Sequence, residues 1–185
     1  LNTKRIEQAE RRLAQVLEAN RESLARADKN LEKAERSLTE ARLEAAESLQ
    51  QLNFDAEDAA LSEKKAAIEL EKAREALARV QDLPPNSRAR REAELAYAEA
   101  DLNLRRAKDR NSDLAKETEE ANAKGVEGSD RVVDATERLQ DAIDDKAKAE
   151  RDAIRAQIDA EEALAEAKKK ADSAGGGSGE SAFDK

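Results

Sequence analysis

The chain of 185 residues carries a net charge of −9; charged residues make up 42% of it and aromatic residues only 2%. Because cysteine and histidine are both absent, the composition excludes thiol and imidazole chemistry and the usual zinc ligands. With almost no aromatic side chains to fill a compact core, the composition favours long helices and coiled coils over a globular domain, and an acidic disordered chain is the alternative.

The first segment, residues 1–82, is predicted to be one long helix from about residue 3 to residue 82. Its apolar residues recur in steps that mostly alternate between four and three, a pattern typical of a coiled-coil seam that a disordered chain has no reason to keep. Seam positions also fall on Asn20 and on Ser48 or Leu49, where the alternation is interrupted by a stutter that locally unwinds a supercoil. The predicted apolar seam consists of Leu13, Leu17, Leu24, Ala27, Leu31, Ala34, Leu38, Ala41, Ala45, Leu52, Ala56, Ala59, Ala66, Leu70, Ala73, Leu77 and Val80.

The stretch VQDLPPNSRARRE contains the only two prolines of the chain, Pro84 and Pro85. A proline inside a helix costs roughly 3 kcal/mol, and Pro84 restricts Leu83 to extended conformations, so the helix must stop here. The sequence therefore predicts a turn over residues 83–87, after which Asn86 or Ser87 caps the next helix.

The direction of the chain after this turn has two interpretations. The helical segments on the two sides contain equal numbers of residues, and folding at the prolines would bring the glycines of residues 125–128 close to the stutter near residue 49. We therefore expect an all-α, antiparallel helical hairpin of coiled-coil helices that turns at Pro84 and Pro85. The alternative is an extended, parallel, homo-oligomeric rod.

The second and third segments are predicted to be helices over residues 88–124 and 129–173. Between them, residues 125–128 form a break that contains Gly125 and Gly128, in which Gly125 adopts the left-handed conformation that ends many helices. Ser129 or Asp130 then offers the cap of the third helix. Residues 174–185 have the composition of a flexible Gly/Ser linker into a following segment. The predicted seam of these helices consists of Ala93, Tyr97, Ala100, Leu104, Ala107, Asn111, Leu114, Thr118, Ala121, Val132, Leu139, Ile143, Ala153, Gln157, Ala160, Leu164, Ala167 and Ala171.

Three seam residues are singled out as structural. Tyr97 is predicted to pack in the seam with its hydroxyl at the edge. Asn20 and Asn111 also fall on seam positions, where a buried amide can determine the register or the number of strands at a cost in stability.

The same patterns argue against enzymatic and ligand-binding functions. Carboxylates are abundant but interleaved with Lys and Arg on solvated faces, without the cleft that paired catalytic acids need. We therefore expect no enzyme, no catalytic, cofactor-binding or metal-binding residue, and no cofactor. The acidic charge argues against direct nucleic-acid binding, and no apolar run is long enough to place this segment in a membrane.

Residues 88–143 contain four motifs: E-L-A-Y at residues 94–97, R-N-x-D-L at residues 110–114, A-N-A-x-G-V-E-G-S-D at residues 121–130 and V-V-x-A-x-E-R-L at residues 132–139. In this order they resemble a stretch of the tail tape measure proteins of siphophages that infect Actinobacteria. The final E-S-A-F-D-K also resembles the start of the segment that follows in that family, whereas residues 1–82 match only in their alternation of Ala with charged residues.

The resemblance implies a structural, coiled-coil section of a virion protein. It would fill the phage tail lumen after assembly in the host cytoplasm, set the tail length and leave ahead of the DNA during genome ejection. The implied partners are the tail tube protein, tail assembly chaperones, tail-tip proteins and further copies of the chain, with a trimer favoured in the tail. The alternatives are the receptor-binding helical hairpin of a bacteriocin and a coiled-coil stalk or cytoskeletal protein.

Overall fold

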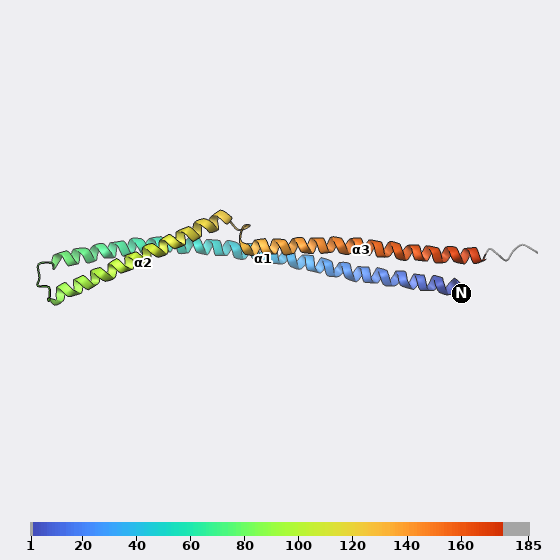
Figure 1. Cartoon of the computed structure of the whole chain (residues 1–185), viewed down its shortest axis with the longest axis horizontal. Helices are drawn as coiled ribbons and strands as arrows, with labels where there is room; N and C mark the ends of the chain where they lie inside the picture. Colours follow the sequence, from blue (N-terminus) through green and yellow to red (C-terminus); the bar gives the residue numbers. More distant parts are fainter. Residues whose placement is uncertain (1, 176–185) are drawn as a thin grey trace, which may run out of the picture. The chain divides into compact units, whose positions relative to one another are not determined.

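The computed structural model describes residues 2–175, and every regular element in that range is an α-helix. The helices are α1 (Asn2–Arg79), α2 (Arg88–Lys124) and α3 (Asp130–Gly175) (Figure 1). This confirms the all-α class and the three long helices. Residues 174 and 175, expected in the linker, continue α3, and the rest of the expected linker lies outside the described residues.

The turn at the prolines begins slightly earlier than the sequence predicts. α1 ends at Arg79 rather than at residue 82, because Val80 donates to the carbonyl of Leu77 (3.2 Å) and Leu83 donates to that of Val80 (3.1 Å). Bonds to the third preceding residue tighten the chain into turns and leave the last α-helical carbonyls without helical partners.

Arg90 satisfies two carbonyls at this turn. Its Nη1 atom donates to the carbonyl oxygen of Leu83 at 3.0 Å and to that of Gln81 at 3.3 Å. A cation at the carboxyl end of a helix also complements the helix dipole. On the other side, Ser87 caps α2 in an extended conformation, and its Oγ accepts from the backbone N–H of Arg90 at 3.4 Å.

The described residues form two compact units. Unit 1 comprises residues 2–39 of α1 and residues 134–175 of α3. Within it, Asn20 Nδ2 donates to the carbonyl of Ala153 at 2.8 Å, and Lys146 Nζ lies 2.7 Å from Asp28 Oδ1. The residue number rises along α1 as it falls along α3, so the two helical segments of unit 1 run in opposite directions.

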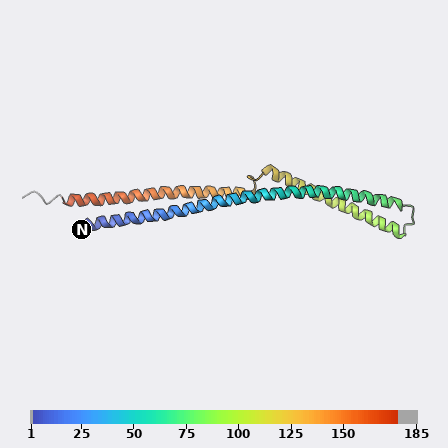
Figure 2. The same cartoon turned by 180° about the vertical axis from the view of Figure 1, so that it is seen from behind.

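Unit 2 comprises residues 40–133, and therefore the end of α1, all of α2 and the first residues of α3. Asn122 Nδ2 donates to Asn53 Oδ1 at 3.0 Å, and Asn111 Nδ2 donates to Glu63 Oε2 at 2.6 Å. Here too the residue number rises along α1 as it falls along α2, so the two helical segments of unit 2 run in opposite directions. Both views of the chain show α2 beside this part of α1 (Figures 1 and 2).

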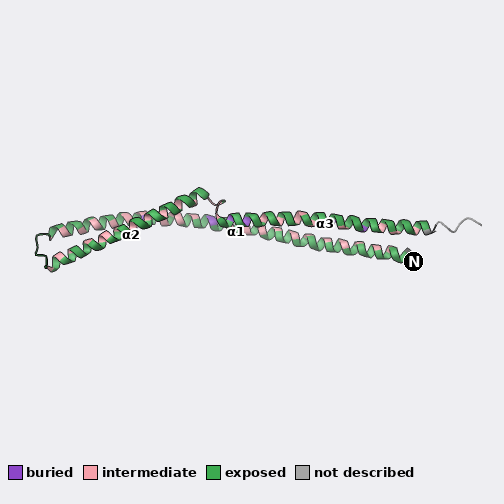
Figure 3. Ribbon diagram, viewed as in Figure 1, coloured by how far each residue is buried: buried purple, intermediate pink, exposed green. Residues whose placement is uncertain are grey.

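Little of either unit is buried (Figure 3). Val132 is the only large side chain among the described residues that is fully enclosed. Alanine supplies most of the other buried positions, so each contact removes little apolar area from water. The buried residues are Leu38, Ala135, Ala153 and Ala160 in unit 1 and Ala45, Ala59 and Val132 in unit 2.

Several predicted seam positions are wrong by one residue. Val16 and Ala142 are half-buried, whereas the predicted Leu17 and Ile143 are 44% and 43% exposed. Gln157 is likewise exposed. The register of α3 explains the shift, because the contacts of Lys146 and Ala153 turn the face that contains Ala142 toward α1, and a one-residue step rotates a side chain by about 100°.

Candidate functional site: the glycine break and its cavity

A break of five residues separates α2 from α3. Gly125 ends α2 with φ 64° and ψ −172°, and its N–H donates to the carbonyl of Ala121 at 2.9 Å. The prediction of a positive φ was right, but the left-handed helical conformation was wrong because ψ is extended. Essentially only glycine adopts this combination of φ and ψ. The chain therefore changes direction at Gly125 instead of continuing the helix.

Gly128 is required for a different reason. Gly125 is the only positive-φ residue in the described chain, so Gly128 has an ordinary φ. A Cβ atom on Gly128 would lie 2.4 Å from the carbonyl oxygen of Lys124. The backbone therefore passes too close to the end of α2 for any side chain to fit.

Ser129 precedes the first residue of α3. Its carbonyl accepts hydrogen bonds from the N–H groups of Val132 and Val133, each at 3.0 Å. Its hydroxyl was a candidate for the cap, but the Oγ atom is buried without a hydrogen-bond partner. Asp130, in the first turn, places a carboxylate where the helix dipole favours a negative charge.

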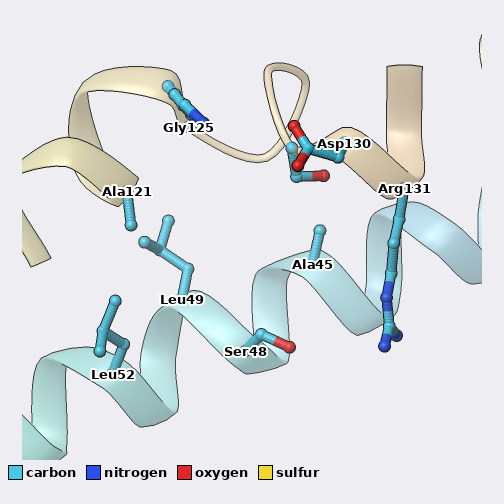
Figure 4. A pocket seen from close by; sticks show the side chains of 10 residues that line it. Ala45, Ser48, Leu49, Leu52, Ala121, Gly125, Asp130 and Arg131 are labelled. Carbon is cyan, nitrogen blue, oxygen red and sulfur yellow. The ribbon is translucent and has the colours of Figure 1, made fainter. Parts of the chain in front are cut away.

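A cavity of about 360 Å³ lies beside this break, within unit 2. Figure 4 shows Leu49 and Leu52 of α1 on one side of it and Ala121 of α2 on the other. The stutter that the sequence placed at Ser48 or Leu49 lies here, and Leu49 is the half-buried residue of the two. The lining residues are Ala45, Ser48, Leu49, Leu52, Ala121, Lys124, Gly125, Ser129, Asp130 and Arg131.

Two ion pairs beside this cavity join α1 to the break and to the first turn of α3. Arg42 Nε lies 2.8 Å from Glu127 Oε1, and Arg131 pairs with Glu44. All four side chains are at least half exposed, so each pair contributes only about 0–1 kcal/mol. They help to orient the connection more than they stabilise it.

Among the described residues, the cavity contains neither a serine–histidine pair nor a cluster of three metal ligands. Ser129 has no histidine base available, since the chain contains none. Within residues 2–175 no three potential metal ligands of the His, Cys, Asp and Glu types cluster together. What the geometry does provide is a sharp, glycine-dependent interruption between two helices.

The other residues singled out from the sequence lie at separate places. Pro84 and Pro85 are exposed in the turn after α1, where the carbonyl of Pro84 accepts from the N–H of Ser87 at 2.8 Å. Tyr97 is half-buried on α2. Asn20 and Asn111 are half-buried and donate to partners on other helical segments, but their role in determining register stays a prediction.

Besides the two ion pairs beside the cavity, sequence reasoning missed two further cross-helix contacts. The Asn53–Asn122 bond lies beside the seam of unit 2 and not on a predicted seam position. In unit 1, the hydrogen bond and the charge of Asp28 raise the pKa of Lys146 above its usual value, with smaller contributions from Glu150 and Glu35. A search for opposite charges at positions that flank both seams could have found this second contact.

No family model matches this sequence, and comparisons with curated proteins and with solved structures found no match either. None of the described helices has an apolar stretch long enough to cross a membrane.

Proposed function

We propose that this chain is a structural section of a tail tape measure protein that fills the lumen of a siphophage tail and sets its length. The single observation that carries this proposal is that nearly all described residues lie in three long helices. A helix rises about 1.5 Å per residue, so the number of residues becomes a length in space. The motifs of residues 88–143 add the resemblance to that family.

The remaining parts of the proposal follow from the same role. The section assembles in the host cytoplasm with tail assembly chaperones, lies inside the tail tube protein with the tail-tip proteins as further partners, and leaves ahead of the DNA. Its acidic surface suits a lumen shared with DNA, because like charges repel. In the tail we propose three extended copies side by side.

For the isolated chain we propose the antiparallel helical hairpin that turns at Pro84 and Pro85. The contacts within each unit support it, since Asn20 pairs with Ala153 in unit 1 and Glu63 pairs with Asn111 in unit 2. Each joins helical segments that run in opposite directions. An alanine-lined seam also needs a partner helix, because isolated helices gain little from such small side chains.

Spin labels on residues 14 and 155 are expected to distinguish the hairpin from the rod. Both positions are exposed, and the chain contains no other cysteine that would take a label. In the hairpin the labels should lie within a few nanometres, since paired helices are about 10 Å apart. In an extended rod they would be separated by roughly 200 Å at helical rise. Pulsed electron resonance on chains diluted with unlabelled protein measures the distance within one chain, and no measurable coupling would contradict the hairpin.

Paired deletions in the parent gene are expected to shorten the virion tail in proportion to the residues removed. Deleting residues 56–76 together with 98–118 removes three heptads from each side of the proline turn. Extended copies would shorten the tail by about 63 Å, and a section folded double by about 32 Å, at 1.5 Å per residue. Electron micrographs of mutant particles provide the measurement.

The control for this experiment replaces the same residues by a scrambled sequence of equal length and composition. The tail should then keep the length of the parent virion, because the number of residues and not their order determines the tail length. An unchanged tail in the deletion mutant would refute the tape measure proposal.

The antiparallel contacts also favour one alternative, the receptor-binding hairpin of a bacteriocin. Its tip would be the turn around Leu83, which is 40% exposed and has no aromatic neighbour in the segment LPPNS. Binding hot spots are enriched in Trp, Tyr and Arg, so this tip is a weak candidate. Tail-length measurement separates the two functions.

A further inference from the structure

An exposed apolar stripe runs along the part of α1 that lies in unit 2. It consists of Phe54, Leu61 and Ile68, which are 52%, 50% and 52% exposed. Their spacing of seven residues keeps them on one face of the helix. Three large apolar side chains half open to water on one line form a surface that another helix can cover.

This stripe lies on the side of α1 that points away from α2. Leu61 is two residues from Ala59, which is 2% exposed, and two residues from Glu63, which bonds to Asn111 of α2. Two residues correspond to about 200° around a helix, so the stripe is nearly opposite the α2 contact. A partner helix can pack there without displacing α2.

The charges around the stripe are arranged symmetrically about Leu61. The acidic residues Glu57 and Asp58 lie on one side of it and the basic residues Lys64 and Lys65 on the other, and all four are exposed. Among the described residues none of these four side chains takes part in an ion pair. Phe54 and Ile68 are also equally far from Leu61 in the sequence, each at seven residues.

This symmetry indicates which helix can cover the stripe and in which direction that helix runs. If a second α1 runs antiparallel and the two Leu61 side chains meet, Phe54 of each copy faces Ile68 of the other. Glu57 and Asp58 of each copy then face the two lysines of the other copy. A parallel partner in register would place like charges against each other, which is unfavourable.

We propose that a second copy of this chain binds to the stripe as an antiparallel, two-fold symmetric dimer with Leu61 on the axis. Such an interface is self-complementary, because the same patch serves both copies. The stripe contains only three large side chains, so the buried area is below that of a standard stable interface and the dimer should be weak. The inference concerns the chain in solution and is independent of the proposed function.

The first test is sedimentation equilibrium of the full chain at low ionic strength, where exposed charges act most strongly. The wild-type chain should show a monomer–dimer equilibrium. Leu61→Lys should raise the dissociation constant by about tenfold or more, because both copies lose the central contact. Leu61→Ala, which keeps a strong helix former, should weaken the dimer less than Leu61→Lys but in the same direction.

The matched control is Leu95→Lys on α2. Leu95 is 60% exposed in the same unit but lies on the other helix, so its replacement should leave the dissociation constant within about twofold of wild type. A wild-type chain that stays monomeric or forms a trimer would overturn the proposal, as would equal weakening by the two lysine variants.

Two charge variants test whether the charges that flank the stripe contribute to pairing. One carries Glu57→Lys and Asp58→Lys and is basic throughout the patch; the other carries Lys64→Glu and Lys65→Glu and is acidic throughout. Each should fail to dimerise alone, whereas the mixture should form a heterodimer because opposite charges then meet in every position. Circular dichroism confirms that helicity is retained, and homodimers of either variant would overturn the proposal.

Single spin labels report the geometry directly. In an antiparallel dimer, labels on Ser62 of the two copies lie close together, whereas labels on Glu47 lie about 40 Å apart at helical rise. In a parallel dimer both distances would be short. Two equally short distances would therefore refute the antiparallel arrangement.

Discussion

Val132→Asp is expected to unfold unit 2 under conditions in which the wild-type unit is fully folded. Val132 is 0% exposed, and an ionised carboxylate enclosed there without a partner costs about 3–5 kcal/mol. That is a large fraction of the 5–15 kcal/mol by which folded domains are typically stable. The loss should appear as a lower urea midpoint or as complete unfolding at room temperature.

Val133→Asp provides the matched control. Val133 is adjacent in sequence, 43% exposed, and lies in the same first turn of α3, so both variants gain the same favourable interaction with the helix dipole. Its unfolding free energy should change by no more than about 0.5 kcal/mol. The difference between the two variants therefore isolates the effect of burial.

Tyr97 makes this experiment specific to unit 2. It is the only tyrosine, the chain has no tryptophan, and it lies on α2. Tyrosine fluorescence during urea unfolding therefore reports unit 2, while the far-ultraviolet circular dichroism reports both units. Equal stability of the two aspartate variants would show that Val132 is not enclosed.

Gly128→Ala is expected to destabilise the same unit by an amount at the upper end of about 1–3 kcal/mol. The added Cβ would lie 2.4 Å from the Lys124 carbonyl oxygen, and the nearby Cα and carbonyl carbon of Lys124 belong to the same rigid backbone. The end of α2 would have to move. Gly125→Ala should also destabilise, but only through its positive φ, because nothing lies within 4 Å of a Cβ at that position.

Glu127→Ala is the control for the glycine substitutions. This variant places the same alanine side chain at residue 127, next to Gly128. It also removes one exposed ion pair with Arg42, which is worth about 0–1 kcal/mol. Urea unfolding followed by Tyr97 fluorescence compares the three variants. Should Gly128→Ala cost no more than Glu127→Ala, the close approach at the end of α2 would be wrong.

The positions of the helices and of both breaks follow from local chemistry. Pro84 cannot continue a helix and restricts Leu83, and the glycines after Lys124 stop α2, whatever the rest of the chain does. Unbroken runs of strong helix formers account for the three helices. The early end of α1 is equally local, since Val80 and Leu83 each donate to the carbonyl of the third preceding residue.

The details of the candidate site were less accessible from sequence. The spacing around Gly125 predicts a positive φ, but ψ depends on where the next helix must start, and that is set by packing in unit 2. Ser129 has the side chain of a good cap, yet its buried hydroxyl is left without a partner. The need for glycine at residue 128 arises from one close approach to Lys124, which no local pattern reveals.

The sequence by itself therefore determined the helical class, the two interruptions and the small, alanine-rich seam, because these depend on propensities and periodicities of neighbouring residues. The tertiary structure decided which side of each helix is buried. The contacts Asn20–Ala153 and Asp28–Lys146 turn α3 so that Ala142 is half-buried and the larger Ile143 stays in water. A periodic pattern allows neighbouring registers that differ by one residue, and only contacts between residues far apart in the sequence select one of them.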